Sequence, residues 1–194
     1  MHSQNEEERV ILEIVGDDEP SLFLDIGAWD GLTFSNTAAL VERGWSGLMI
    51  EPGLEATMGL LKNHGGNDRV TILHAAVGFE RSIVPFWNTP DAVGTTSRDH
   101  YEKWQSAGGY TGAFYTPVIT LADIFNQFGG GWQVISIDAE GISVDLFCSL
   151  DLANLQPKVI CVEHDERHVA IDQHAQASGY KRIYTSGENV VYAL

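Results

Sequence analysis

The feature that most constrains the fold is an alternation of short apolar runs with helix-like segments along most of the chain. The apolar runs predict strands at 22–26, 47–50, 70–77, 134–137 and 159–162. The intervening and flanking segments predict helices at 5–16, 33–43, 54–63, 121–128, 143–150 and 166–178. Short buried strands that alternate with helices indicate a mostly parallel sheet covered on both faces.

Two further strands, 181–185 and 190–194, close the chain, and a tight turn joins them. A short turn allows only antiparallel pairing, so this hairpin is expected at one edge of the sheet. The sequence therefore predicts an α/β fold with a mostly parallel seven-stranded sheet and a C-terminal antiparallel β-hairpin. A length of 194 residues fits a single domain, 1–194. Residues 78–116 interrupt the alternation as a loop-rich insert.

The charge of the chain argues against several classes of partner. Eleven Lys and Arg stand against 27 Asp and Glu, which gives a net charge of −16. Nucleic acids and anionic membranes attract basic surfaces, so neither is expected as a partner.

No apolar run approaches the roughly 20 residues of a membrane span, and the polar, acidic N-terminus is unlike a signal peptide. Cys148 and Cys161 lie in apolar stretches, which indicates reduced thiols and a cytoplasmic location.

Acidic residues follow most of the predicted strands. In an open parallel sheet, ligands bind at the carboxyl ends of the strands, near the point where the strand order reverses. The residues expected at that edge are Asp25, Gly27, Glu51, Ala76, Asp138, Glu140, Glu163, His164 and Asp165. So many acids exceed what a solvated rim needs, which indicates a binding or catalytic site.

The loop after the first strand discriminates between two kinds of cofactor. Nicotinamide dinucleotide sites use G-x-G-x-x-G, whereas this loop reads D-x-G-x-x-x-G from Asp25 to Gly31 and carries the bulky Trp29. An acid before a glycine loop suits a cofactor with a cationic amine and no phosphate, such as S-adenosylmethionine. Glu51, at the end of the next strand, is placed to accept both hydroxyls of an adenosine ribose. The alternative is that Gly27 and Gly31 merely form a turn.

Longer motifs surround these acids: Phe23-Leu24-Asp25-Ile26-Gly27-Ala28-Trp29-Asp30-Gly31, Ser35-Asn36-Thr37, Gly44-Trp45-Ser46-Gly47-Leu48-Met49-Ile50-Glu51-Pro52 and Ile137-Asp138-Ala139-Glu140-Gly141. Together with Thr120-Leu121-Ala122-Asp123 and Val162-Glu163, they resemble the FkbM family of S-adenosylmethionine-dependent methyltransferases. The resemblance runs from about residue 22 to residue 180. It implies a class I methyltransferase (Rossmann-like) fold and methyl transfer to oxygen, often on a sugar or polyketide hydroxyl. At position 29 the family commonly has Asn instead of Trp.

Position and resemblance together assign roles to the site residues. The cofactor is expected to contact Asp25, Gly27, Gly31, Ser35, Asn36, Glu51, Ala76 and Asp138. Ser35 and Asn36 could either hold the carboxylate of the cofactor or cap the following helix. An alcohol must lose its proton during attack, so a general base is required. The expected catalytic residues are, in order, His164, Glu140 and Asp138.

A divalent cation is an alternative use of the same edge. Asp138, Glu163, His164 and Asp165 could gather magnesium, manganese or calcium, because carboxylates and an imidazole suit these ions. A bound cation would lower the pKa of a substrate hydroxyl. Metal dependence stays open at this point.

The sequence thus predicts an S-adenosylmethionine-dependent O-methyltransferase for a hydroxyl of a small polar acceptor, such as a sugar or glycan. A cofactor-binding module without catalytic activity is the alternative, and a homo-oligomer is left open. The aromatic residues of the insert 78–116 indicate a lid that stacks on a sugar ring, or else an ordinary packed excursion or a contact between two copies. Within the insert, Gly94-Thr95-Thr96-Ser97 is expected near the active site.

Overall fold

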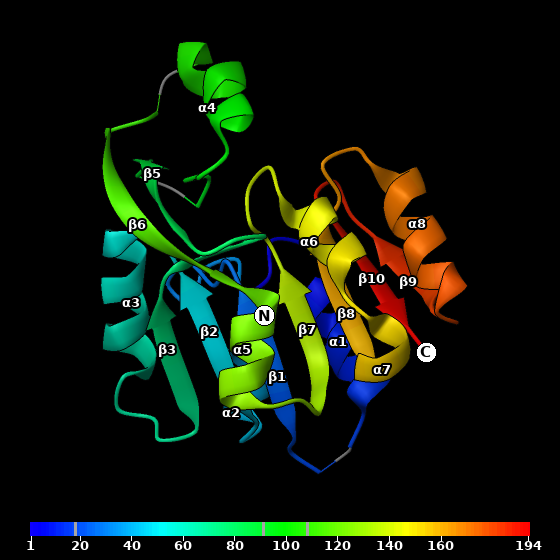
Figure 1. Ribbon diagram of the computed structural model, residues 1–194. Helices are drawn as coiled ribbons and strands as arrows, with labels where there is room; N and C mark the ends of the chain where they lie inside the picture. Colours follow the sequence, from blue (N-terminus) through cyan, green and yellow to red (C-terminus); the bar gives the residue numbers. More distant parts are fainter. Residues whose placement is uncertain (18, 91, 108) are drawn as a thin grey trace.

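The computed structural model describes residues 1–17, 19–90, 92–107 and 109–194, and a seven-stranded sheet runs through its centre (Figure 1). The strand order is β3-β2-β1-β7-β8-β10-β9, with the bounds Val70–His74, Ser46–Glu51, Leu22–Ile26, Trp132–Ile137, Val159–Glu163, Asn189–Ala193 and Lys181–Thr185. The strands from β3 to β8 pair in parallel, and β10 pairs antiparallel with both β8 and β9. The predicted α/β fold with its C-terminal antiparallel hairpin is therefore confirmed.

Helices cover both faces of this sheet (Figure 1). One face carries α1, α2 and α3, with the bounds Glu7–Val15, Ala38–Glu42 and Leu54–His64. The other carries α5, α6, α7 and α8, with the bounds Leu121–Phe128, Ser143–Ser149, Leu152–Leu155 and His168–Ala177. Side chains along a strand alternate between faces. Phe23 of β1 accordingly packs in the cluster with α1 and α2, whereas Leu24 and Ile26 pack in the cluster with α5 and α6.

The second helix begins later than the sequence predicts. A helix was expected over 33–43, but α2 spans only Ala38–Glu42. The carboxylate of Asp30 accepts hydrogen bonds from the backbone amides of Leu32 and Thr33. The hydroxyl of Ser35 accepts hydrogen bonds from the backbone amides of Thr37 and Ala38. Short polar side chains thereby satisfy the amides locally, and this competes with helix formation. The helix prediction is wrong over 33–37.

The predicted strand 70–77 is divided between two sheets. β3 ends at His74 in the main sheet, and β4 (Ala76–Gly78) belongs to a second sheet with the order β4-β6-β5. β5 spans Ser82–Asn88, and β6 spans Gly112–Thr120. Antiparallel pairing of β5 with β6 brings the two ends of the insert together.

The insert 78–116 holds more regular structure than the loop-rich segment expected from the sequence. It contains β5, α4 (Arg98–Trp104), the 3-10 turn Gln105–Ala107 and half of β6. Pro85 weakens the strand signal, since proline is tolerated in strands chiefly at sheet edges, and β5 is such an edge. α4 has no buried residue, so an apolar helical period is absent from its sequence.

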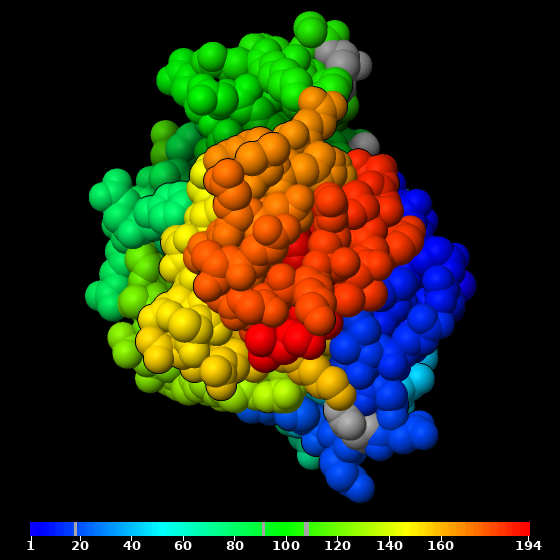
Figure 2. Space-filling view, turned by 90° about the vertical axis from the view of Figure 1, so that its right-hand side faces the viewer, coloured from blue at the N-terminus to red at the C-terminus, as the bar shows by residue number. Residues whose placement is uncertain are grey.

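The carboxyl ends of β1, β2, β7 and β8 lie at one edge of the main sheet, and the second sheet and α4 lie beyond that edge (Figure 1). Figure 2, turned by 90°, shows the green α4 segment rising above the orange atoms of the α8 region. The insert therefore faces the edge at which the sequence gathers its acids.

Two smaller expectations concern the whole chain. In the described ranges, Cys161 is buried, Cys148 is half-buried, and both are free thiols. None of the helices in those ranges has the length and apolarity that crossing a bilayer requires.

Candidate active site

The loop that follows β1 passes very close to the end of β7. Gly27 has φ +82°, and a Cβ atom there would lie 1.7 Å from the carbonyl oxygen of Asp138. The amide of Asp138 donates to the carbonyl of Ile26 at 2.8 Å, which ties the two strand ends together. Glycine combines this backbone conformation with so close an approach because it has no Cβ. The glycine loop and the acids after β7 are thus held side by side.

Gly31 supports the loop from the other side. It has φ +73°, and a Cβ atom there would lie 2.7 Å from the ring of His64. The His64 ring nitrogen Nε2 lies 2.9 Å from the carbonyl oxygen of Gly31. Of the eight residues expected to contact the cofactor, all of them described, Gly31 does not line the cleft at this edge. Its position instead fastens the loop to α3.

The cleft lies between the ends of β1, β2 and β7 and the insert. It is lined by the other seven expected cofactor residues: Asp25, Gly27, Ser35, Asn36, Glu51, Ala76 and Asp138. The insert contributes Phe86, Gly94, Thr95 and Thr96 to the lining, in line with the expectation that 94–97 approaches this site. The second sheet is what returns the insert to the cleft.

Glu51 is buried in this cleft and is held by backbone amides. Its Oε2 accepts a hydrogen bond from the amide of Trp29 at 3.0 Å, and its Oε1 accepts one from the amide of Gly53 at 2.6 Å. Burial raises the pKa of the Glu51 carboxyl to about 8, although these two hydrogen bonds act in the opposite direction. Each carboxylate oxygen can accept more than one hydrogen bond. Glu51 is therefore an oriented acceptor with remaining capacity for hydroxyl donors.

Asp25 lies beside it at the end of β1. Its Oδ2 accepts a hydrogen bond from the hydroxyl of Thr37 at 2.6 Å. Burial raises the pKa of the Asp25 carboxyl to about 6, and hydrogen bonds from Thr37 and Ser136 oppose that rise. A carboxyl group in so confined a site favours a cationic group as its partner.

The segment 35–37 caps the start of α2 and also borders the cleft. Ser35 Oγ accepts from the amides of Thr37 and Ala38 at 3.2 and 3.0 Å, so this side chain does cap the start of α2. Ser35 and Asn36 also line the cleft. The side-chain amide of Asn36 donates a hydrogen bond to the hydroxyl of Ser136 on β7 at 3.4 Å. Capping thus fixes the polar wall of the cleft.

Three carboxyl groups converge where β7 and β8 end. Ligand oxygens of Asp138, Glu140 and Glu163 lie within 4.8 Å of one another. The hydroxyl of Ser143 donates to Glu163 at 2.7 Å and accepts from the amide of Ala139 at 2.7 Å. Burial raises the pKa of both Asp138 and Glu163. Repulsion from Asp25 adds to the rise at Asp138, where a hydrogen bond with Glu163 opposes it, and repulsion from Asp138 adds to the rise at Glu163. This hydrogen-bonded pair therefore binds a proton more tightly than ordinary surface acids do.

The metal set expected from the sequence forms only in part. Asp138 and Glu163 meet as anticipated, but Glu140 completes the group of three in place of His164 and Asp165. An all-carboxylate set suits a hard cation such as magnesium or calcium.

His164 lies apart from this group. Its Nδ1 accepts a hydrogen bond from the amide of Glu166 at 3.1 Å, and its ring packs on His168 with centroids 4.0 Å apart. Burial lowers the pKa of the His164 imidazole, and the neighbouring His168 lowers it further. Although fully described, His164 is absent from the lining of the cleft and from that of the cavity beside it.

A second cavity adjoins the cleft and shares Glu140 with it. One wall comes from the insert and includes His100, Lys103, Trp104 and Tyr110. The opposite wall is acidic, with Glu163, Asp165, Glu166 and Glu188. The hydroxyl of Thr95 donates to the carbonyl of Glu140 at 2.7 Å, so the insert is fastened to the strand end between the two spaces.

His100 is the imidazole that faces this cavity. Its Nε2 lies 3.6 Å from Oε2 of Glu140, and burial lowers the pKa of the ring although Asp165 opposes this. No sequence motif pointed to His100, because it lies in the aromatic insert and not at a strand end. The dense aromatic composition of 78–116 was the available signal, and it indicates a binding wall only in general terms.

Comparison with known proteins identifies a family for the chain. The family model of the methyltransferase FkbM domain matches residues 25–182. A search of curated proteins finds no matching sequence.

Solved structures show the same fold at low sequence identity. The METTL16 MTase domain superposes with a TM-score of 0.53 and 10% identity, over 96% of this chain and 65% of that chain. This chain thus spans just under two thirds of that domain. The human methyltransferase 10 domain containing protein gives a TM-score of 0.52 and 10% identity, over 96% of this chain and 78% of that chain. The domain match covers most of the sequence, and the chain therefore belongs to the FkbM family of S-adenosylmethionine-dependent methyltransferases.

Proposed function

We propose that this chain transfers a methyl group from S-adenosylmethionine to a hydroxyl of a small polar acceptor, a sugar or glycan. The observation that carries the proposal is the pair of adjoining cavities that share Glu140. One cavity holds the polar residues that suit the cofactor, and the other is wide, partly aromatic and lined by carboxylates. Their junction is where a methyl donor and a hydroxyl would meet.

The residues of the cleft fit the cofactor by their chemistry. The carboxylate of Glu51 would accept the ribose hydroxyls, Asp25 would attract the cationic amine, and Ser35 with Asn36 would bind the carboxylate. The cofactor supplies an activated methyl group on a sulfonium. The protein then contributes alignment of the acceptor and placement of charge, which account for most of the acceleration in a displacement of this kind.

Removal of the acceptor proton falls to the acids at the junction. Glu140 borders both cavities and lies beside His100, so it would take the hydroxyl proton as general base. Asp138 borders the cleft only, and its raised pKa suits proton exchange near neutrality. His164 heads the sequence-based order of bases, but it lines neither cavity, which favours Glu140 and Asp138 for this role.

The walls of the second cavity support a neutral or cationic acceptor. Trp104 and Tyr110 provide aromatic surface of the kind that stacks on sugar rings, and acidic side chains outnumber the ammonium of Lys103. An acceptor with phosphate groups would be repelled, in agreement with the net charge of −16. A nucleic acid is disfavoured on the same ground.

The test is a transfer assay with labelled methyl donor and three matched classes of acceptor: neutral sugars, amino sugars and sugar phosphates. We expect transfer to one of the first two classes and none to the third. A parallel assay with EDTA tests whether a cation takes part. If EDTA abolishes turnover and a divalent ion restores it, the three carboxyl groups hold a cation.

Binding of S-adenosylhomocysteine is measured in parallel by calorimetry. Binding without transfer to any hydroxylated acceptor would contradict the enzymatic proposal and would favour a cofactor-binding module. Absence of binding would contradict the cofactor assignment itself.

A further inference from the structure

Two adjacent glutamates at the start of α1 are buried, although nothing in the transfer reaction calls for them there. Glu7 is 0% exposed and Glu8 is 1% exposed. A buried carboxylate is costly unless hydrogen bonds compensate for its lost hydration. The partners of each glutamate therefore indicate what its burial maintains.

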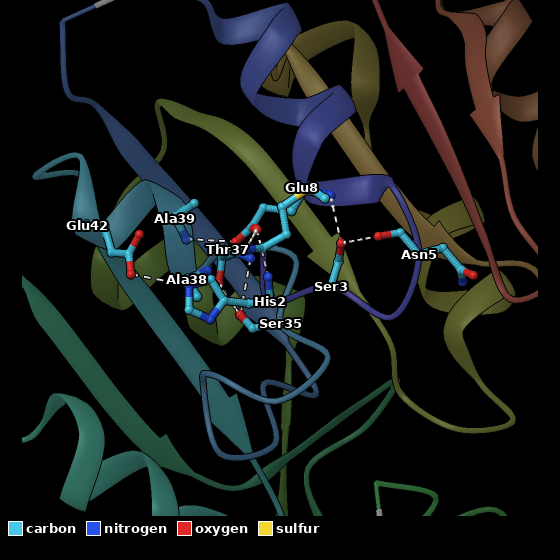
Figure 3. Close-up of polar contacts among 10 residues, drawn as sticks. His2, Ser3, Asn5, Glu8, Ser35, Thr37, Ala38, Ala39 and Glu42 are labelled. Carbon is cyan, nitrogen blue, oxygen red and sulfur yellow. Dashed lines mark hydrogen bonds and ion pairs between the residues drawn. The ribbon is translucent and has the colours of Figure 1, made fainter.

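Glu8 connects the N-terminal segment to the start of α2 (Figure 3). Its Oε1 accepts a hydrogen bond from the amide of Ala39 at 3.1 Å, and its Oε2 accepts one from the amide of His2 at 2.8 Å. Ser35 already accepts from the amides of Thr37 and Ala38. Three successive amides are thus bound by side chains, and Glu8 supplies the last of these acceptors.

The same segment forms the polar wall of the cofactor cleft. Ser35 and Asn36 line the cleft, and the hydroxyl of Thr37 donates to the buried carboxylate of Asp25. The backbone of Ser3 forms a bridge with that of Phe34, directly before this wall. The N-terminal segment and Glu8 therefore contact the segment 34–39 at both of its ends.

We propose that Glu8 is a positioning residue for cofactor binding, which acts by holding the segment 34–39 in the conformation that presents Ser35 and Asn36 to the cleft. This proposal rests on the assignment of those two side chains to the cofactor. Glu8 itself is absent from the lining of the cleft, so its effect passes through the backbone of this segment.

Glu7 offers a matched control one residue away. It is equally buried, but its carboxylate accepts from the backbone amide and the side-chain amide of Asn5, at 3.0 and 3.4 Å. Among the described hydrogen bonds, none joins Glu7 to the segment 34–39. Replacing Glu7 removes a buried carboxylate from the same helix turn without releasing the cleft wall.

The experiment measures the Kd of S-adenosylhomocysteine by calorimetry for wild type, Glu8→Ala, Glu8→Gln and Glu7→Ala, at a temperature where all are folded. Loss of the hydrogen bond that Glu8 accepts from the amide of Ala39 predicts about 10- to 100-fold weaker binding for Glu8→Ala. Glu8→Gln keeps one acceptor oxygen, and we expect about 3- to 10-fold weaker binding. Glu7→Ala should lower the Tm and leave the Kd within about twofold of wild type.

Hydrogen exchange of the backbone amides of Thr37, Ala38 and Ala39, measured without ligand, tests the same proposal independently of cofactor binding. Faster exchange there in both Glu8 variants, with Glu7→Ala unchanged, supports it. Equal loss of affinity in the Glu7 and Glu8 variants would overturn it, as would unchanged affinity or unchanged exchange in Glu8→Gln. Glu8→Gln alone decides if Glu8→Ala does not fold. Wild type that fails to bind the ligand would contradict the cofactor assignment, and the exchange result would still decide whether Glu8 holds the segment.

Discussion

The loop 25–37 and the insert 78–116 border the same cleft, but different interactions hold them. Buried carboxylates and backbone amides fix the loop, as at Glu51 and Asp25. In the insert, α4 has no buried residue, and its contacts are largely aromatic, such as the stacking of Tyr101 on Trp87 with centroids 4.8 Å apart. From this difference we expect the loop, as the proposed cofactor side, to be the more rigid, and α4, on the proposed acceptor side, to be the more adaptable.

The largest expected effect tests the rigidity of the loop. Gly27→Ala would place a Cβ atom 1.7 Å from the carbonyl of Asp138 in a backbone conformation that alanine rarely adopts. We expect a loss of at least about 3 kcal/mol in the free energy of unfolding, or failure to fold. Chemical denaturation measures it.

Gly112→Ala in the insert is the control. Gly112 also has a positive φ, +154°, but a Cβ atom there meets nothing within 4 Å. Gly112→Ala should lower the free energy of unfolding by about 1 kcal/mol, the scale of backbone strain alone. Equal costs for the two variants would remove the contrast between a tightly approached loop and an open insert.

Glu140 lies where the two sides meet, and Glu140→Gln keeps its shape while removing its basicity. Loss of a general base lowers turnover by about 10²- to 10⁴-fold. Affinity for S-adenosylhomocysteine should remain nearly intact, since the effect arises in the transition state. Single-turnover methyl transfer, with the Kd measured separately, provides both quantities.

His164→Ala is the comparison for this variant, because the sequence placed His164 first among the bases and the structure locates it outside both cavities. We expect its turnover to stay within about tenfold of wild type. If His164→Ala matched the loss in Glu140→Gln, the assignment of the base to the junction of the cavities would be wrong.

Glu51→Ala tests the cofactor side alone. Removing this buried acceptor leaves the ribose hydroxyls without a partner and weakens S-adenosylmethionine binding by about 1.5–3 kcal/mol. The KM of the acceptor should be unchanged, because Glu51 lines the cleft and not the second cavity. Calorimetry and steady-state kinetics on the folded variant separate these effects, and unchanged cofactor affinity would remove Glu51 from the site.

Buried acids on the rigid side also predict how stability depends on pH. The pKa of Asp25 rises from 3.8 to about 6 and that of Glu51 from 4.5 to about 8, in both cases chiefly through burial. The folded protein then binds these protons more tightly than the unfolded chain. Their contribution to stability is complete at low pH and is lost as the pH rises through the window from about 4 to 8.

Urea denaturation from pH 5 to pH 8 measures this slope. Glu51→Gln removes the group with the higher pKa, so the decline between about pH 6 and pH 8 should become shallower. A wild-type stability that rises over this range would show that other groups dominate the titration.

The contrast between the two sides also explains what sequence reasoning reached. Glycine loops, strand ends and acids are local patterns, and Asp25, Gly27, Glu51 and Asp138 line the cleft as predicted. Gly31 lies in the same loop, but its contact with His64 is a tertiary fact that spacing does not reveal.

The contribution of the insert to the site is harder to predict from the sequence. His100 is brought to Glu140 by pairing of β5 with β6, a long-range contact without a periodic signal. His164 was favoured for its ordinary pKa near neutrality, but burial and its packing on His168 make it a poorer candidate. Local sequence patterns therefore predict the loop side of the cleft, whereas the insert side depends on long-range strand pairing that such patterns do not reveal.

The smallest expected effect probes the adaptable side. Trp104 lines the second cavity, remains 46% exposed, and belongs to a helix without buried residues. Trp104→Ala should therefore leave the Tm nearly unchanged. An aromatic contact contributes about 0.5–1.5 kcal/mol, so the KM of the acceptor should rise about 2- to 10-fold with cofactor affinity intact. Tyr115→Ala, an exposed aromatic of β6 outside both linings, is the control and should change neither constant. If both variants shifted cofactor affinity, the two sides would be coupled, and the division between a rigid cofactor wall and an independent acceptor wall would fail.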